Sequence, residues 1–382
     1  MIDWNKLSED EFRHEVRTFY KKKYPASLDG VWHHLTWDET RGWYKKLYEK
    51  GWAAPSWPVE HGGMNLDISR QLIFNEERLD VARGPDFVGI SMLGPILIQY
   101  GTEDQKRAHL TKTLAGEHRW AQGYSEPGAG SDLASLKTEA RLEGGEYVIN
   151  GQKIWTSWAL DATHIFVLVC TDKQAAKKQQ GISFLLADIK SPGITIRGIR
   201  NLTGRSAFCE VFFDNVRVPK LNLVGEPNKG WTVAKSLVGM ERLFIGSPKH
   251  CQFALDRLTR VVRARGLDRD AGYLDEITKL RLDVEDLATL YAYFADIVRR
   301  GEELPVEVAM LKIFATDTLQ LITEKLLEVS GESGVMTGGA TFGDYVIDPL
   351  NMYYMARPTT IGGGSNEVLR DVLAKQLLAC AS

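Results

Sequence analysis

The spacing of hydrophobic and polar residues changes twice along the chain. Up to about His118 the apolar residues recur at helical intervals. Ser8 is followed three residues later by Glu11, a pair that is typical of a capping box at a helix start. The stretch 51–63 is rich in glycine and proline and predicts a loop within this helical region.

From about Trp120 to Gly225 the pattern favours short strands. Asn150-Gly151 lies between two apolar runs and predicts a hairpin turn. Short strands separated by turns predict a small antiparallel barrel or sandwich. A βαβ unit of about 30 residues is not recognisable, which argues against a Rossmann fold. Further strand-like runs are 165–170, 182–187, 194–199 and 209–213.

From Trp231 onwards the helical spacing returns. Its clearest apolar stripe consists of Leu280, Val284, Leu287, Tyr291, Phe294 and Val298. Similar patterns predict helices over 309–329 and 368–378, and such stripes fit either a four-helix core or an oligomer interface. The fold class expected is therefore α+β and multidomain. The predicted domains are an α-helical N-terminal domain (1–118), a middle antiparallel β-barrel-like domain (119–227) and a C-terminal four-helix-bundle domain (228–382).

Composition is consistent with this division. The chain has 382 residues, enough for two or three domains at about 100–200 residues each. A net charge of −3 argues against attraction to nucleic acid through bulk charge. The longest apolar runs, such as 164–170, are far shorter than the ~20 residues that a membrane-spanning helix needs. The first residues also lack a basic-then-apolar signal, so we expect a cytoplasmic protein without a membrane span.

Cysteine and histidine positions predict neither disulfides nor a metal site. The four cysteines lie far apart without a CxxC pair, so we expect reduced thiols. The eight histidines show no metal-ligand spacing, and the adjacent His33 and His34 would face different ways on a helix or a strand. From sequence, the protein is expected to be free of metal.

Two neighbouring motifs carry candidate chemistry. The stretch 122–133 contains three glycines and a proline, which allow close backbone approach to a ligand, and Ser125 and Ser131 supply hydroxyls. It lacks the third glycine of a dinucleotide fingerprint, and a plain surface loop is the alternative. Trp155, beside two hydroxyl residues, suits a flat aromatic ligand, whereas an ordinary tryptophan of a β core is the alternative.

Taken together, these motifs resemble the acyl-CoA dehydrogenase family of flavoproteins, over nearly the whole chain. The resemblance implies FAD as cofactor, an acyl-CoA as substrate, a role in lipid catabolism (β-oxidation), and helical, β and four-helix domains in that order. The segments that carry the resemblance, in the family's order, are Gly51–Gly63, Tyr124–Asp132, Asn150–Ser157, Val211–Pro219 and Gly363–Arg370.

The resemblance also implies roles for individual residues. Gln122, Tyr124 and Ser125 would line the flavin ring edge. Trp155 would pack against the isoalloxazine, and Ser157 would hydrogen-bond near its N5 atom. The other cofactor-binding residues implied are Gly130, Ser131, Thr156, Glu328, Gly331, Ser365 and Glu367. For the substrate, the implied residues are Ser131 at the pantetheine arm, Arg242 toward the CoA phosphates, and Gly364.

The family places its catalytic glutamate at one of two positions. The commoner position falls here at Gly363, which has no carboxylate. The alternative position falls at Glu241, immediately before Arg242. The resemblance therefore implies that Glu241 removes the α-proton while hydride passes to flavin N5, giving a trans-2-enoyl-CoA. The backbone N–H of Gly363 would donate to the thioester oxygen. A helix carboxylate that reaches solvent or pairs with a base is the alternative for Glu241.

The chain departs from the family where relatives bind the adenine end of FAD. The arginine that precedes a Phe-Gly pair matches either Arg263 or Arg265, because no Phe-Gly pair follows. Glu328 and Glu332 add negative charge where a pyrophosphate would lie. We therefore expect a heterotetramer with a related dehydrogenase subunit, with a homotetramer or homodimer as alternatives.

Two other functions are compatible with the same fold and the same sequence. A flavin monooxygenase or oxidase would react with oxygen without needing CoA, and a degenerate subunit would serve assembly alone. For the dehydrogenase, an electron-transferring flavoprotein is the expected electron acceptor. The sequence leaves the acyl group open among linear, branched, dicarboxylic and steroid side-chain thioesters.

Overall fold

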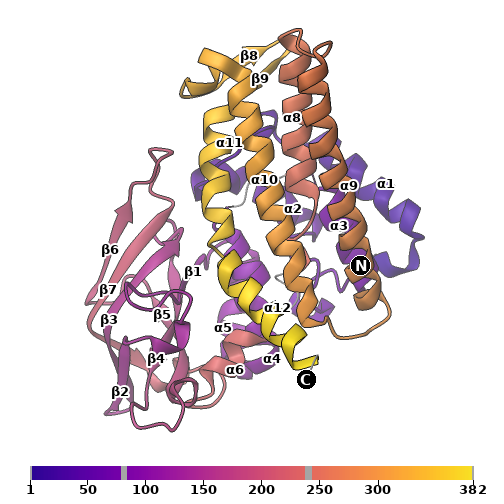
Figure 1. The fold of residues 1–382 in the computed structure, drawn as a ribbon. Helices are drawn as coiled ribbons and strands as arrows, with labels where there is room; N and C mark the ends of the chain where they lie inside the picture. The colour runs from indigo at the N-terminus through magenta and orange to yellow at the C-terminus, as the bar shows by residue number, and fades with distance from the viewer. Residues whose placement is uncertain (1, 79–83, 237–242, 381–382) are drawn as a thin grey trace. The chain divides into compact units, whose positions relative to one another are not determined.

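The computed structural model describes residues 2–78, 84–236 and 243–380 (Figure 1). Its contacts divide the chain into two compact units. The first unit consists of Met1–Pro25, His34–Glu77 and Ala82–Leu237, and the second of Ala26–His33, Arg78–Val81 and Val238–Ser382. The first unit therefore contains the N-terminal helices and the seven-stranded sheet, and the second contains the C-terminal helices with a two-stranded hairpin.

Local signals start the helices of the first unit. Ser8 and Glu11 form the predicted capping box, and Thr36 with Glu39 forms another. The predicted loop 51–63 contains only a short 3₁₀ turn, Val59–His61. The helices of this unit are α1 (Glu9–Lys23), α2 (Trp37–Lys50), α3 (Ile68–Glu77), α4 (Gly94–Tyr100), α5 (Glu103–Leu114) and the later α6 (Gly230–Lys235).

Seven strands form one curled sheet in the first unit, in the order β1-β4-β2-β3-β7-β6, with β5 paired to β4. The pairing is mainly antiparallel, but β1 runs parallel to β4, with Trp120 opposite His164. The strands are β1 (Trp120–Gly123), β2 (Glu139–Glu143), β3 (Glu146–Ser157), β4 (His164–Cys170), β5 (Ile182–Asp188), β6 (Ile194–Ile199) and β7 (Phe208–Pro219). The strand-like runs of the sequence are thus strands.

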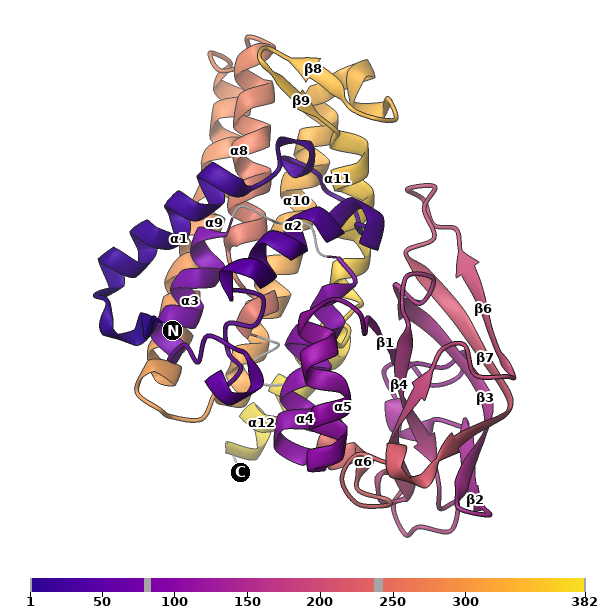
Figure 2. The same ribbon diagram turned by 180° about the vertical axis from the view of Figure 1, so that it is seen from behind.

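Strands β4 and β5 are buried on both faces of the sheet. Along β4, Ile165 and Val167 belong to the core inside the curled sheet, whereas Phe166 and Leu168 belong to the core that the helices share. Alternate side chains of a strand point to opposite faces, so a strand covered on both sides reads as a continuous apolar run. Figure 2 shows α4 and α5 beside β1, and Trp120 lies in the shared core.

The predicted hairpin turn at Asn150-Gly151 is wrong. Strand β3 continues through both residues, and the turn falls instead at Gly144 and Gly145, between β2 and β3. The register between β3 and β7 shifts between Ile149 and Gly151, which marks a β-bulge. Glycine fits a bulge as well as a turn, so the Asn-Gly pair alone does not separate the two.

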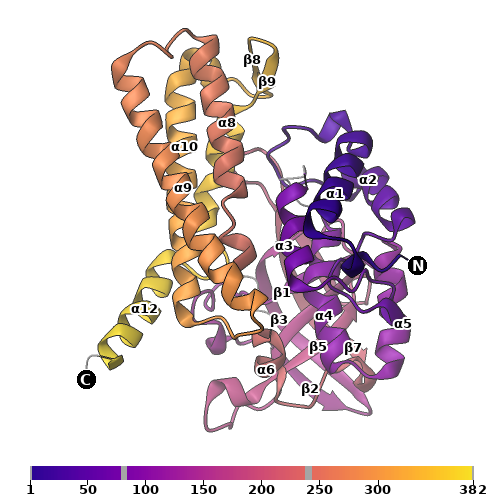
Figure 3. The ribbon, with the colours of Figure 1, turned by 90° about the vertical axis from the view of Figure 1, so that its right-hand side faces the viewer.

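The second unit is a helical bundle with a small hairpin. Figure 3 shows α8, α9 and α10 running side by side, with the β8–β9 hairpin at one end. The predicted stripe is confirmed, since Leu280, Val284, Leu287 and Phe294 are buried in α9. The elements are α8 (Lys249–Ala264), α9 (Ala271–Arg299), α10 (Ala309–Ser330), β8 (Ala340–Phe342), β9 (Tyr345–Ile347), α11 (Pro349–Ala356) and α12 (Asn366–Cys380).

The helical, β and helical order confirms the predicted fold class. The three domain boundaries stay a prediction, since the first two segments share one hydrophobic core. Over the described ranges, no helix combines the length and the apolar character that crossing a bilayer requires. Cys170, Cys209 and Cys251 are all free thiols.

Candidate functional site

Trp155 lies at an irregularity of β3. The register with β7 shifts between Lys153 and Thr156, so Trp155 stands outside the regular ladder. Its φ of +59° lies in the left-handed region, which a bulky side chain rarely adopts, and the residue is 58% exposed. A strained backbone that holds a large ring in the open is typical of a ligand contact. Trp155 therefore offers a ring face to a flat ligand.

The two hydroxyl residues after Trp155 have different surroundings. Thr156 is buried, and its Oγ1 atom has no hydrogen-bond partner among the described residues. Ser157 is half-buried at the end of β3, opposite Phe208 of β7. A buried hydroxyl without a partner costs free energy, and each such group points to a missing partner. A flavin ring edge, which carries donors and acceptors, fits this position.

The loop after β1 lies against the Trp155 segment. The backbone N–H of Ile154 donates to the carbonyl oxygen of Ser125 over 2.9 Å. Gln122 is half-buried on β1, and the ring of Tyr124 packs edge-on against Phe166 at 5.8 Å. The structure thus brings the sequence-predicted residues of the flavin ring edge together with Trp155 in one unit.

A buried ion pair fixes that loop. Lys153 Nζ donates to Glu126 Oε1 over 2.8 Å and to the carbonyl oxygen of Tyr124 over 3.1 Å. The Glu126 carboxylate also accepts from the backbone N–H groups of Lys137 (2.6 Å) and Thr138 (2.9 Å). Both charged side chains are almost wholly buried. Neither residue was given a role from sequence, yet together they hold the loop to β3.

Burial and pairing act in opposite directions on this pair. Burial lowers the pKa of Lys153 to about 8, although the charge and hydrogen bond of Glu126 act to raise it. Burial also opposes ionisation of Glu126, but Lys153 and the hydrogen bonds of Thr138 and Lys137 hold the pKa of this carboxyl below its usual value. At neutral pH both groups therefore carry charge and attract each other.

The end of the loop at Gly130 and Ser131 is exposed to solvent. Gly130 and Ser131 are exposed, and a Cβ built on Gly130 would meet no atom within 4 Å. These two residues, predicted to contact FAD and the pantetheine arm, are therefore accessible. The structure separates a tethered end of the loop, near Glu126, from an accessible end.

A second buried lysine holds a glycine segment in the second unit. Lys312 of α10 donates to the carbonyl oxygen of Gly364 and to Asn366 Oδ1, each over 2.8 Å. Asn366 in turn donates to Thr316 Oγ1 (3.0 Å) and Asp317 Oδ1 (2.8 Å). This network fixes the backbone directly after Gly363, the residue that sequence predicted to bind the thioester oxygen.

Gly363 itself has a φ of +69°, which favours glycine. Burial lowers the pKa of Lys312 to about 8, with the carboxylates of Asp317 and Glu367 acting to raise it.

Ser365 Oγ accepts from the backbone N–H of Val368 over 3.3 Å at the start of α12. Glu367, predicted to bind cofactor, is exposed in the first turn of that helix.

The predicted catalytic base and its neighbour, Glu241 and Arg242, lie outside the described residues. The chain directly after them is described, and Leu243 there is fully buried. A Cβ built on Gly363 would lie 3.2 Å from Ile245 Cδ1. The segment that follows the predicted base thus packs against the residue that occupies the family's other base position.

The two segments that depart from the family pattern at the adenine end of FAD lie next to each other, at the ends of α8 and α10. Arg265 donates to the carbonyl oxygen of Ser330 over 2.7 Å. Gly331 has a φ of +57°, and a Cβ there would lie only 2.7 Å from the Arg265 guanidinium. Glu328 is exposed and pairs with Lys325 at 2.6 Å, so part of its negative charge is offset within the same helix.

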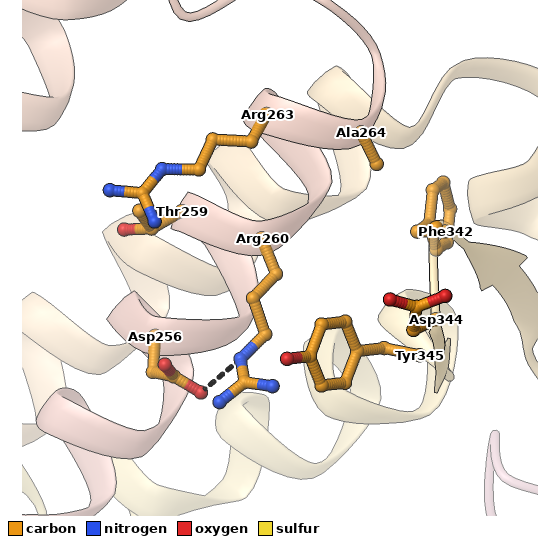
Figure 4. A pocket seen from close by; sticks show the side chains of 9 residues that line it. Asp256, Thr259, Arg260, Arg263, Ala264, Phe342, Asp344 and Tyr345 are labelled. Atoms are coloured by element: carbon orange, nitrogen blue, oxygen red, sulfur yellow. Dashed lines mark hydrogen bonds and ion pairs between the residues drawn. The ribbon is translucent and has the colours of Figure 1, made fainter.

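Arg263, the other candidate match, has different surroundings. It lines a pocket of about 420 Å³ between α8 and the β8–β9 hairpin (Figure 4). The Arg260 guanidinium in this pocket stacks over the Tyr345 ring at 3.9 Å and donates to Asp256 over 2.8 Å. The pocket lining consists of Asp256, Thr259, Arg260, Arg263, Ala264, Phe342, Gly343, Asp344 and Tyr345.

Sequence reasoning missed the residues that hold both glycine segments. Lys312 was detectable, because it is a single charge within the apolar run 308–315 and shares a helix face with Val308 and Ala315. Lys153 gave no comparable signal, because a lysine on a short strand is usually exposed. Asn366 and Glu126 lie within the family motifs, but the sequence predicted no role for either of them.

Comparison with known proteins identifies the family of the chain. The acyl-CoA dehydrogenase N-terminal, middle and C-terminal domains match residues 7–117, 121–216 and 228–378. The chain is 33% identical over 380 residues to the acyl-CoA dehydrogenase IpdE1 of Mycobacterium tuberculosis, with 97% of each chain covered.

Solved structures give the same result. The "Tcur3481-Tcur3483 steroid ACAD" has a TM-score of 0.86 at 29% identity, with 97% of each chain covered. The ChsE4-ChsE5 complex from Mycobacterium tuberculosis has a TM-score of 0.84 at 28% identity, again with 97% of each chain covered. Since all three domains and full-length relatives match, the chain belongs to the acyl-CoA dehydrogenase family, whose members are FAD-dependent oxidoreductases that act on acyl-CoA.

Proposed function

We propose that this chain oxidises the Cα–Cβ bond of an acyl-CoA thioester to the trans-2-enoyl-CoA, with Glu241 as the base. The observation that carries the proposal is the exposed, strained Trp155 beside the unpartnered hydroxyl of Thr156. Together they fit the face and edge of a flavin. Bound FAD would supply the hydride acceptor for the reaction.

The ring-side residues orient the reaction. Trp155 would cover one ring face, and Ser157 would hydrogen-bond near N5. Gln122, Tyr124 and Ser125 would line the ring edge. Because the Glu126–Lys153 pair holds the loop to β3, these contacts are preorganised before the cofactor arrives. A fixed ring position is needed, since hydride transfer depends on the distance and orientation of the substrate β-carbon.

Removal of the α-proton needs a base and a stabilised thioester oxygen. With Gly363 in place of the commoner glutamate, the base must come from elsewhere, and Glu241 precedes a segment that packs against Gly363. The Gly363 N–H would donate to the thioester oxygen, where negative charge develops. Lys312 acts as a positioning residue, because it fixes the next carbonyl group, that of Gly364.

The CoA part of the substrate would lie along accessible groups. Ser131 is exposed and would contact the pantetheine arm, Gly364 would contact the thioester end, and Arg242 would lean toward the phosphates. An arginine suits that role because its guanidinium binds phosphate oxygens in pairs.

The test is Glu241→Gln in the assembled enzyme, with the exposed Glu303→Gln as matched control. Anaerobic stopped-flow absorbance would follow flavin bleaching by acyl-CoA. We expect Glu241→Gln to bind FAD normally but to slow bleaching by about 100-fold or more, as loss of a general base does. The control should bleach at the wild-type rate. Unchanged bleaching in Glu241→Gln would refute the base assignment, and rapid reoxidation of wild-type flavin by air would indicate an oxidase instead.

The assembly we propose is a heterotetramer with a related dehydrogenase subunit that completes the adenine end of FAD. The charge of Glu328 and the missing Phe-Gly pair support this, and a similar solved structure is described as a ChsE4-ChsE5 complex. Full FAD occupancy in a homo-oligomer of this chain alone would remove the need for a partner. An electron-transferring flavoprotein as acceptor and a cytoplasmic location stay predictions.

For the acyl group, we propose a bulky, ring-bearing thioester. The support is that one similar structure is described as a "steroid ACAD". A panel of linear, branched, dicarboxylic and steroid side-chain CoA thioesters, scored by the rate of flavin bleaching, would test this. Fastest bleaching by a short linear thioester would contradict it.

A further inference from the structure

Three histidines far apart in the sequence meet in the first unit. They are His109 on α5, His118 in the turn before β1, and His164 at the start of β4. One potential ligand atom from each lies within 4.8 Å of the others. The Nδ1 atoms of His109 and His118 are 3.2 Å apart, and the ring centres of His118 and His164 are 4.0 Å apart.

The backbone fixes this convergence. The N–H of His118 donates to the carbonyl oxygen of Lys112 over 3.1 Å, which folds the turn back on the end of α5. Strand β1 then pairs in parallel with β4, with Trp120 opposite His164. All three rings lie beside the buried Trp120 ring, at 4.8–6.3 Å between centres. The cluster is therefore part of the packed fold and not a chance meeting of surface side chains.

The spacing of the rings matches metal coordination. Two imidazole nitrogens at about 2.0–2.1 Å from a tetrahedral Zn²⁺ lie about 3.3 Å from each other. The His109–His118 separation of 3.2 Å already has this value. The remaining separations, up to 4.8 Å, would have to shorten by ring rotation for all three nitrogens to bind one ion. Each histidine is only partly buried, so an ion can reach the nitrogens from solvent.

We propose that His109, His118 and His164 form a binding site for a borderline divalent transition-metal ion, with Zn²⁺ as the natural occupant. Three imidazoles without a carboxylate favour Zn²⁺ and its transition-metal neighbours over Ca²⁺ or Mg²⁺, which prefer oxygen ligands. Three protein ligands leave the fourth tetrahedral position to water.

The neighbours of the cluster suit this use. Thr163 Oγ1 lies 2.9 Å from Nδ1 of His164, and it also accepts from the Arg119 N–H over 2.9 Å. This contact holds the ring and leaves Nε2 for the ion, as outer hydrogen bonds do in known metal sites.

Charged groups face the cluster from three elements. Lys112 on α5 and Arg119 before β1 oppose a bound cation, whereas Asp188 on β5, opposite His164 in the ladder, favours it. The cluster lies at the start of β1. Gln122 and Tyr124, the flavin-edge residues that follow on this chain segment, come two and four residues after Trp120, or about 7 and 13 Å at about 3.3 Å per strand residue. None of the three histidines is itself a flavin-edge residue, and we expect metal to stabilise the unit without entering the reaction.

The experiment uses tag-free, chelator-treated full-length protein and adds Zn²⁺ alone in isothermal titration calorimetry. We expect one ion per chain and a higher Tm with Zn²⁺. His118→Gln and His164→Gln should each weaken binding by about 10–100-fold or more. The matched control is the exposed His14→Gln on α1, which should bind as wild type. Binding that is lost equally in the control, or unaffected in both cluster variants, would overturn the site.

A second measurement does not depend on variants. Crystals of the wild-type protein soaked in Zn²⁺ should give an anomalous peak at the zinc edge between the three rings. Co²⁺ in its place should give the visible absorption bands of a tetrahedral ion. No peak at millimolar Zn²⁺ would refute the proposal even if the variants failed to fold, and it would leave the dehydrogenase proposal unaffected.

Discussion

Both compact units use a fully buried lysine to hold a glycine-containing segment, but they satisfy its charge differently. In the first unit, Lys153 pairs with the Glu126 carboxylate and holds the loop that begins at Tyr124. In the second, Lys312 donates to two neutral oxygens, those of Gly364 and the Asn366 side chain. Both lysines have a pKa of about 8.

The difference shows how a nearby carboxylate can offset the effect of burial on the pKa of a lysine. Burial is the main cause of the lowered pKa of both lysines, and at Lys153 the charge and the hydrogen bond of Glu126 act against it. Lys312 is helped only by the more distant carboxylates of Asp317 and Glu367. The first arrangement is therefore sensitive to loss of its partner, because an unpaired buried charge is costly, whereas the second depends on hydrogen-bond geometry.

The largest effect should come from breaking the ion pair. Glu126→Gln leaves the Lys153 charge buried without its partner, so we expect a loss of about 3–5 kcal/mol in the free energy of unfolding. Chemical denaturation at pH 7 would measure it. The double variant Glu126→Leu with Lys153→Met should recover part of the loss. A single variant as stable as wild type would show that the pair contributes little to the fold.

Removing the second lysine should cost less. Lys312→Met leaves the Gly364 carbonyl and the Asn366 side chain without their donor, at about 1–3 kcal/mol. Flavin bleaching by acyl-CoA should also slow, through a lower kcat, because Gly363 loses its support. Exposed Lys375→Met is the control for both measurements. A stability loss with an unchanged kcat would confine Lys312 to a structural role.

The lowered pKa of Lys312 predicts a pH dependence. Between about pH 8 and 10.5 the unfolded chain keeps this proton while the folded chain releases it. The contribution of Lys312 to the free energy of unfolding therefore rises with pH across this window and is constant below it. The stability difference between wild type and Lys312→Met should shift in favour of wild type from pH 8 to 10.5. A difference that stays flat would contradict the lowered pKa.

The lowered pKa of Glu126 predicts a second pH dependence of stability, on the acid side. Its pKa is held below the usual value in the folded chain, so its stabilising contribution is complete above about pH 4.5 and is lost as the pH falls through the folded value. The denaturation midpoint of wild type should fall in this acid range relative to that of the double variant. Parallel acid profiles of the two proteins would argue against an ionised Glu126.

The smallest effect on stability is expected at Trp155. Trp155→Gly removes an exposed ring and relieves a positive φ, so the free energy of unfolding should change by about 0.5 kcal/mol or less. FAD occupancy of the assembled enzyme, measured by flavin absorbance, should nevertheless fall. Full occupancy in this variant would remove Trp155 from the cofactor site.

Much of the fold could be predicted from local sequence signals. Ser8 with Glu11 starts a helix, and the stripe from Leu280 to Phe294 is buried, because both depend on neighbours within a few turns of one helix. The Asn150-Gly151 pair failed as a turn, since the pairing of β3 with β7 extends the strand through it. The residues of the candidate site were predicted largely from the family resemblance. Lys153 and Lys312, which hold the site in place, were not predicted from the sequence.

The sequence by itself determined the order of helical and β regions, the helix starts and the family motifs, because these are written in local spacing and in short strings. Only the tertiary structure decided which polar side chains are buried and which distant ones meet. Lys153 with Glu126 and the cluster of His109, His118 and His164 are such meetings. Their partners are chosen by strand register and helix packing, whose free energy comes from contacts between residues tens of positions apart.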